Sequence, residues 1–232
     1  MKNKIGVLGG MGPLATTIYM ENVISYTGAK NDQENVPMII INDTEIPDRT
    51  SYLLGKSSYS PYPKLLSNIK DLEKLGCNYI FIICNTSHAF YDELQKNTSA
   101  NIINMVEETL KECKNRGFKK VGLLATEGTI NSKIYEKFNK FDLNLFVPND
   151  SIQKAITSFI YDYVKQNKNV NSDEFLNVLD YFYKNDCDSV ILGCTELSVI
   201  YKKLNLINDN RIVDSTKVVA ELTIKISGKN IN

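Results

Sequence analysis

The stretch Tyr79-Ile80-Phe81-Ile82-Ile83-Cys84-Asn85-Thr86 is an apolar run of strand length that ends in a thiol and two small polar residues. Ligand crevices of open α/β sheets lie beyond the carboxyl ends of the strands. The same pattern returns at Asp188-Ser189-Val190-Ile191-Leu192-Gly193-Cys194-Thr195. The sequence therefore predicts two strands that each carry a thiol at the functional edge of a sheet.

The surrounding segments repeat in the same order. Gly6, inside the glycine-containing run 5–10, corresponds to Gly122 in the run 121–126, and the run 102–104 corresponds to 212–214. A repeat of about 110 residues is far longer than a solenoid unit, so it indicates duplication of a whole lobe. Two facing lobes of parallel strands and helices would bring both thiols to one cleft.

The predicted fold class is α/β, with two pseudosymmetric three-layer lobes and the active site between them. Each lobe is expected to hold a mainly parallel four-stranded sheet flanked by helices. The predicted strands lie at 5–10, 36–42, 79–83, 102–103, 121–126, 143–147, 188–193 and 212–214. The expected lobes are 1–117 and 118–215, and a closing helix in 216–232 is expected to pack back on the first lobe.

Composition excludes several classes of function. The chain has 232 residues, 43% of them hydrophobic, with 27 basic and 27 acidic side chains, so no basic surplus points to nucleic acid or an anionic membrane. The absence of a signal-like or 18-residue apolar segment leads us to expect a cytoplasmic protein. The five cysteines form no C-x-x-C pair and His88 is the one histidine, which argues against a disulfide framework and a metal site.

Two similar groups on opposite sides of a cavity suit proton removal from one face of a carbon and delivery to the other, which is racemisation. One of Cys84 and Cys194 must then be a thiolate while the other is a thiol. The alternative is that both are small buried apolar residues, a common fate of unpaired cysteines. Cys77, Cys113 and Cys187 lie away from the predicted functional edge and are interpreted as structural. No pyridoxal-phosphate signature is evident, so no cofactor is expected.

Cations for an acidic substrate follow from the same repeat. Arg49 lies in a polar loop, predicted at 44–60 and a candidate lid, and the repeat brings Lys165 to the equivalent position. One cation from each lobe suits a dicarboxylate, although each is also explained as a surface charge and Lys165 alternatively as a Schiff-base lysine. His88 is a weaker candidate for activating Cys84, and Glu196 is a candidate for tuning Cys194.

These motifs together resemble the aspartate/glutamate racemase family, most closely its aspartate racemase branch, over essentially the whole chain. The segments that carry the resemblance are Leu8-Gly9-Gly10-Met11-Gly12-Pro13, Ile46-Pro47-Asp48-Arg49-Thr50, Cys84-Asn85-Thr86-Ser87-His88, Gly122-Leu123-Leu124-Ala125-Thr126, the stretch 161–165 and Gly193-Cys194-Thr195-Glu196. The resemblance implies a cofactor-independent two-base racemase, usually a homodimer, that acts on a small acidic amino acid.

The resemblance also implies roles for individual residues. Cys84 and Cys194 correspond to the acid/base pair, Met11 to the glycine turn that lines the site, and Arg49 and Lys165 to the contacts with the side-chain carboxylate. The residues expected around the amino-acid head are Asn85, Thr86, Ser87, Thr126 and Thr195.

Departures from the glutamate racemase branch favour aspartate as substrate. That branch typically has an aspartate in the first turn and a histidine after the second cysteine-threonine, where this chain has Gly9-Gly10-Met11 and Glu196. Glutamate stays a candidate second substrate. Two other hypotheses are a one-thiol isomerase or lyase acting on a small dicarboxylate such as maleate, and a non-catalytic amino-acid binding protein.

Overall fold

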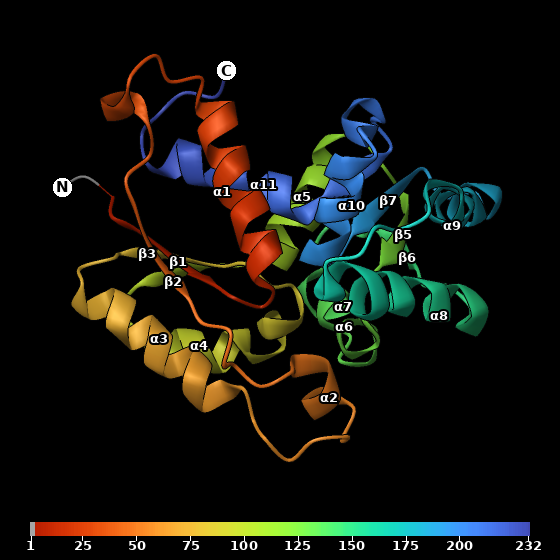
Figure 1. Ribbon diagram of the computed structural model, residues 1–232, viewed down its shortest axis with the longest axis horizontal. Helices are drawn as coiled ribbons and strands as arrows, with labels where there is room; N and C mark the ends of the chain where they lie inside the picture. Colours follow the sequence, from red (N-terminus) through yellow and green to blue (C-terminus); the bar gives the residue numbers. More distant parts are fainter. Residues whose placement is uncertain (1–2) are drawn as a thin grey trace.

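The computed structural model describes residues 3–232, so Met1 and Lys2 of the predicted first lobe lie outside the described residues. Two separate parallel sheets form the two lobes, the first on the left of Figure 1 and the second on the right. This arrangement confirms the predicted α/β class. No helix within residues 3–232 is long and apolar enough to cross a membrane.

The first sheet has the strand order β2-β1-β3-β4, and every neighbouring pair is parallel. Its strands are β1 (Ile5–Gly9), β2 (Met38–Asn42), β3 (Tyr79–Ile82) and β4 (Asn101–Ile103). The helices of this half are α1 (Pro13–Thr27), α2 (Arg49–Leu53), α3 (Tyr62–Lys74), α4 (Tyr91–Lys96) and α5 (Met105–Asn115). Between β3 and α4, a 3₁₀ turn covers Thr86–Phe90.

The second sheet repeats this topology in the order β6-β5-β7-β8, again with parallel neighbours only. Its strands are β5 (Lys120–Leu124), β6 (Asn144–Phe146), β7 (Ser189–Leu192) and β8 (Ile212–Asp214). The helices of this half are α6 (Glu127–Asn131), α7 (Ile134–Phe138), α8 (Asp150–Ser158), α9 (Ser172–Lys184), α10 (Thr195–Lys203) and α11 (Ser215–Ile226).

Strand register preserves the repeat. Ile5 of β1 pairs with Tyr79 of β3, and Val121 of β5 pairs with Ser189 of β7, so the two central pairs match residue for residue. The corresponding glycines of the two sheets are both close to a neighbouring side chain. A Cβ at Gly6 would lie 3.0 Å from Cys77, and a Cβ at Gly122 would lie 2.3 Å from Phe182. Both glycines let a side chain pack closely on the strand, since a Cβ would be too close to Phe182 at Gly122 and in tight contact with Cys77 at Gly6.

Helix α11 crosses from the second sheet onto the first half of the chain, where it lies against α1 and α5 (Figure 1). The Tyr19 hydroxyl of α1 is 2.7 Å from that of Thr223, and Val219, Ala220 and Ile224 join the apolar core between these helices and the first sheet. The C-terminal segment therefore ties the two halves together.

Two segments differ from the sequence predictions. The predicted loop at 44–60 contains the short helix α2, which begins where the Asp48 carboxylate accepts a hydrogen bond from the Ser51 backbone N–H at 2.8 Å. The predicted helix at 152–165 is α8 only as far as Ser158 and continues as a π-helical turn, Phe159–Tyr163, and a 3₁₀ turn, Val164–Gln166. Such π-helical insertions often lie at functional sites.

Candidate active site

The chains that leave β3 and β7 bring Cys84 and Cys194 to one small cavity between the two halves, which we call the chamber. Each cysteine is only 5% exposed. The chamber has a volume of about 10 Å³, and the other residues that line it are Met11, Asp48, Arg49, Thr50, Asn85, Thr86, Thr126, Tyr161, Lys165, Thr195 and Glu196. Space of this size is about what one water needs, so an amino acid requires the walls to move apart.

His88 fixes the turn that carries Cys84 without touching the sulfur. Its Nδ1 is 2.9 Å from the carbonyl oxygen of Cys84, and its Nε2 accepts a hydrogen bond from the Met105 backbone N–H at 3.1 Å. Since the carbonyl can only accept, Nδ1 carries the proton of a neutral imidazole. Burial lowers the pKa of His88, which is fully enclosed. The ring therefore positions the Cys84 backbone, and it is not placed as a base for the thiol.

Asn85 joins the two halves behind the chamber. The Tyr135 hydroxyl donates to Asn85 Oδ1 at 2.8 Å, and Asn85 Nδ2 donates to the Ser215 hydroxyl at 3.0 Å. Ser215 in turn donates to the carbonyl oxygen of Leu192, at the end of β7, at 2.8 Å. This chain of hydrogen bonds connects the residue after Cys84 to the strand that leads to Cys194, so it holds the two thiol-bearing turns in register.

Hydroxyl groups occupy the wall between the halves. Thr86 Oγ1 lies 3.1 Å from Thr126 Oγ1 and 2.9 Å from Thr129 Oγ1. Thr126 also caps α6 by accepting from the Thr129 backbone N–H at 3.1 Å. Ser87 has a different environment from that predicted, because its hydroxyl contacts Met11 Sδ at 3.3 Å and it does not line the chamber. Met11 therefore separates Ser87 from the space between the thiols.

Arg49 brings a positive charge to Cys84. Its guanidinium donates to the carbonyl oxygens of Ile46, Pro47 and Met11 at 3.1 to 3.3 Å. Burial opposes the charged form, but attraction to the Cys84 thiolate and to nearby carboxylates raises the pKa of Arg49. Arg49 is only 6% exposed, and its Nε has no hydrogen-bond partner among the residues that the structure describes. Arg49 is thus a fixed cation with a donor left over for a ligand.

A carboxylate lies beside Cys194, in contrast to the cation beside Cys84. Its thiol donates to Glu196 Oε2 at 3.0 Å, and the Thr195 hydroxyl donates to the same oxygen at 3.3 Å. Burial and, after it, the neighbouring Glu196 carboxylate raise the pKa of the Cys194 thiol well above its usual range. The chamber therefore places a cation beside Cys84 and an anion beside Cys194, so the two thiols have neighbours of opposite charge.

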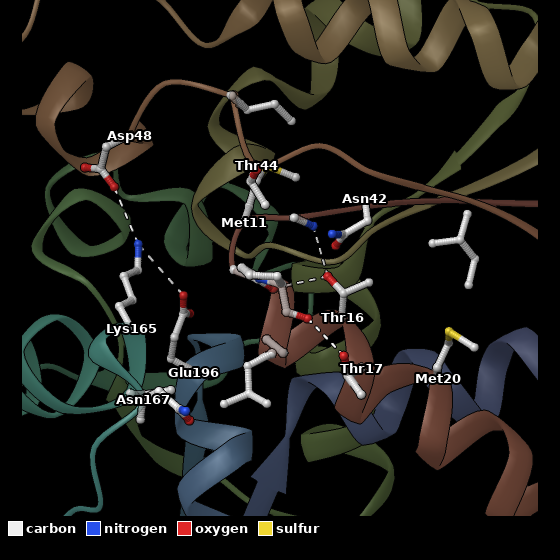
Figure 2. A pocket seen from close by; sticks show the side chains of 18 of the residues that line it. Met11, Thr16, Thr17, Met20, Asn42, Thr44, Asp48, Lys165, Asn167 and Glu196 are labelled. Carbon is white, nitrogen blue, oxygen red and sulfur yellow. Dashed lines mark hydrogen bonds and ion pairs between the residues drawn. The ribbon is translucent and has the colours of Figure 1, made fainter.

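Lys165 bridges the two halves at the rim of the chamber. Figure 2 shows its ammonium between Asp48 and Glu196, at 3.6 Å from Asp48 Oδ2 and 3.8 Å from Glu196 Oε1. The ammonium also lies 4.5 Å from the ring centre of Tyr161, whose hydroxyl donates to Asp48 Oδ2 at 3.3 Å. Both ion pairs are long, and the one with Asp48 is partly exposed, so a substrate carboxylate could replace Asp48 as the partner of Lys165.

A larger cavity of about 760 Å³, which we call the vestibule, lies on the other side of this wall (Figure 2). It shares Met11, Asp48, Arg49, Lys165 and Glu196 with the chamber. The remaining surface is largely apolar and includes Leu14, Met20, Ile40, Ile46 and Val164. A volume of this size suits a small-molecule site.

The sequence profile of the Asp/Glu/Hydantoin racemase family matches residues 8–223. The chain belongs to this family. It is therefore an enzyme of the isomerase class, and the chamber with its two thiols is where racemase chemistry is to be sought. The family assignment agrees with the resemblance found in the sequence motifs.

Individual racemases resemble this chain along nearly its whole length. The broad specificity amino-acid racemase RacX of Bacillus subtilis is 29% identical over 224 residues, covering 95% of this chain and 96% of RacX. The structure of the Picrophilus torridus aspartate racemase is 33% identical, with a TM-score of 0.83, and covers 99% of this chain and 96% of that one. Glutamate racemase from Francisella tularensis, solved with D-glutamate, shares the fold at 21% identity and a TM-score of 0.66, covering 97% of this chain and 81% of that one.

The structure brings most of the predicted racemase residues together. Cys84, Cys194, Met11, Arg49, Asn85, Thr86, Thr126, Lys165, Thr195 and Glu196 all line the chamber, whereas Ser87 does not. Sequence reasoning did not select Asp48, Thr50 and Tyr161 as site residues. Asp48 and Thr50 flank Arg49 within a motif that carried the resemblance, and Tyr161 lies one helical turn before Lys165, so these short spacings were the available signal.

The other three cysteines are buried and unpaired within the described chain. Burial raises the pKa of Cys113 to about 12 and also raises the pKa values of Cys77 and Cys187. A high pKa leaves little thiolate, which is the reactive form. Residues 3–232 contain no cluster of three or more histidine, cysteine, aspartate or glutamate side chains arranged for a metal ion.

Proposed function

We propose that this racemase interconverts L- and D-aspartate without a cofactor, with glutamate as a candidate second substrate. Cys84 and Cys194 act as alternating base and acid on the substrate α-carbon. The observation that carries the proposal is that both thiols line one chamber. The opposite charges beside them, Arg49 and Glu196, give the two thiols the different surroundings that an acid and a base require.

The cations of the chamber support an acidic side chain on the substrate. Arg49 Nε has no hydrogen-bond partner within residues 3–232, and Lys165 is held by ion pairs of 3.6 and 3.8 Å and by the ring of Tyr161 at 4.5 Å. A substrate carboxylate that displaces Asp48 and Glu196 from Lys165 gains charge-assisted hydrogen bonds. The Picrophilus torridus aspartate racemase, at 33% identity, further supports aspartate.

Backbone amides at the start of α10 and the hydroxyls of Thr86, Thr126 and Thr195 line the same chamber as the thiols. Donors of this kind stabilise charge that develops on the substrate carboxylate when the α-proton is removed. These groups are proposed to hold the amino-acid head while Arg49 and Lys165 hold the side chain. Asn85 is proposed to position the turn after Cys84, because its side-chain amide forms hydrogen bonds with Tyr135 and Ser215.

The test is α-proton exchange in heavy water with purified protein and no added cofactor, using both enantiomers of aspartate and of glutamate. Deuterium is expected in the opposite enantiomer from either starting hand of aspartate, because the donating thiol exchanges with solvent. Exchange with glutamate at a similar kcat/KM would extend the substrate range. Absence of exchange with all four amino acids would contradict the proposal.

Closure of α2 over the chamber is proposed to complete the site. A Cβ at Gly128 of α6 would lie only 2.7 Å from Thr50 Cα and 2.8 Å from Thr50 Oγ1 in α2, so these helices meet without room for a side chain. Gly128→Ala is expected to disfavour the closed state by about 1–3 kcal/mol, and so to lower kcat/KM for aspartate by about 10- to 100-fold.

The matched control for this effect is Gly117→Ala, at a left-handed glycine where an added Cβ would have no described atom within 4 Å. This variant is expected to change stability through backbone strain with kcat/KM retained. Wild-type kcat/KM in a folded Gly128→Ala protein would show that α2 need not close as it does here.

Homodimer formation and a cytoplasmic location remain proposals supported by the sequence. Light scattering of the purified racemase at several concentrations measures the first of these directly. A monomer at all concentrations with full aspartate turnover would contradict the dimer.

A further inference from the structure

Glu196 lies on the boundary between the chamber and the vestibule and lines both. Its Oε2 accepts the Cys194 thiol hydrogen at 3.0 Å, whereas its Oε1 is buried and has no hydrogen-bond partner among the described residues. Lys165 Nζ lies 3.8 Å from Oε1, and a Cβ added at Gly12, in the turn that lines the vestibule, would lie 3.4 Å from the same oxygen. Oε2 therefore accepts the hydrogen bond of the Cys194 thiol, and Oε1 lies on the side of the carboxylate toward the vestibule.

The first half of the chain has no such group. The repeat that aligns Cys84 with Cys194 also aligns Thr86 with Glu196. The Thr86 hydroxyl forms hydrogen bonds with the hydroxyls of Thr126 and Thr129. Cys84 instead has the Arg49 cation beside it. The pseudosymmetry of the fold is thus broken at the position that connects a thiol to the larger cavity.

A two-thiol racemase needs a step after the chemistry. Removal of the α-proton by one cysteine and delivery of a proton by the other leave the two thiols with exchanged protonation states. Before the same enantiomer can react again, the new thiolate must regain a proton and the new thiol must lose one. The chamber, at about 10 Å³, offers little solvent for this exchange while it is closed.

We propose that Glu196 carries protons between Cys194 and water in the vestibule, an inference that rests on the proposed racemase function. When the Cys194 thiolate is reprotonated, a water in the vestibule first gives a proton to the Glu196 carboxylate. The hydroxide left behind leaves the vestibule or takes up a proton from the buffer. The O–H bond of Glu196 then breaks as the S–H bond of Cys194 forms. In the opposite direction the Cys194 proton passes to Glu196 Oε2 and then to vestibule water.

The test compares wild type with Glu196→Gln, using protiated L- and D-aspartate at saturating concentration in heavy water. The wild-type product is expected to carry deuterium at the α-carbon in both directions. In Glu196→Gln, proton return is expected to limit turnover, so kcat falls by at least about tenfold in both directions while kcat/KM falls much less. Its product is expected to retain protium passed on from an earlier substrate molecule.

Glu112→Gln is the matched control, since Glu112 pairs with Arg116 and lines neither the chamber nor the vestibule. The product of this variant is expected to carry as much deuterium as the wild-type product. Glu196→Asp, which keeps a carboxylate but withdraws it from Cys194, is expected to give an intermediate kcat with kcat/KM close to wild type.

Two results would overturn the inference. Fully deuterated product with unchanged kcat in either folded Glu196 variant would show that protons reach Cys194 by another route. An equal loss of kcat and kcat/KM would show that Glu196 acts only in the chemical step. If the wild-type protein converts neither enantiomer of aspartate, the proposed function itself fails. This outcome differs from one in which the wild type and the Glu196 variants convert aspartate equally well.

Discussion

Replacement of either Cys84 or Cys194 by serine is expected to lower the rate of aspartate racemisation by about 10²- to 10⁴-fold or more, because a hydroxyl replaces the thiol acid and base. Both thiols line the chamber, with Arg49 beside one and Glu196 beside the other. The measurement is the initial rate of conversion from each enantiomer, followed by chiral chromatography. The loss is expected in both directions for both variants.

Cys187→Ser serves as the matched control. This cysteine occupies the turn before β7, at the opposite edge of the sheet from Cys194, and burial raises the pKa of its thiol. Full activity is expected, since the variant leaves the chamber intact. Wild-type racemisation in folded Cys84→Ser or Cys194→Ser protein would contradict the two-base mechanism.

Arg49→Lys is expected to lower kcat/KM for aspartate by about 10²- to 10⁴-fold, since two hydrogen bonds to charged groups contribute about 1.5–3 kcal/mol each. Lysine keeps the charge but cannot present two parallel donors to a carboxylate. It also lacks the donors that now bind the carbonyl oxygens of Ile46, Pro47 and Met11. Steady-state kinetics with both enantiomers measure the effect.

Arg116→Lys provides the comparison, because Arg116 pairs with Glu112 on the outside of α5. That variant is expected to retain wild-type kinetics, as surface ion pairs contribute little. A folded Arg49→Lys protein with unchanged kcat/KM would mean that Arg49 does not hold the substrate side chain, and Lys165 would then be the remaining cation of the chamber.

Local sequence patterns determined the architecture of this racemase. Continuous apolar runs such as 79–83 and 189–192 predict buried parallel strands, because both faces of such strands are covered by helices. Glycines such as Gly28 and Gly76 mark helix ends, and both adopt the left-handed conformation after α1 and α3. Internal repetition of these short-range patterns was sufficient to predict two similar sheets.

The repeat also indicated which residues share a site, since the carboxyl ends of parallel strands meet at one edge. Cys84 and Cys194 were found in this way, and Arg49 and Lys165 followed from their equivalent positions in the two halves. Ser87 was predicted with its neighbours but faces Met11, because the 3₁₀ turn after Cys84 rotates successive side chains to different sides.

Only the tertiary structure decided how the two thiols differ. The cation beside Cys84 comes from α2 and the anion beside Cys194 comes from α10, and charge effects depend on distance and burial that no local pattern encodes. The same holds for the Asp48–Lys165–Glu196 chain, whose members lie far apart in sequence. The sequence determined which reactive side chains each half contributes, whereas the packing of one half against the other determined which charged group lies beside each thiol.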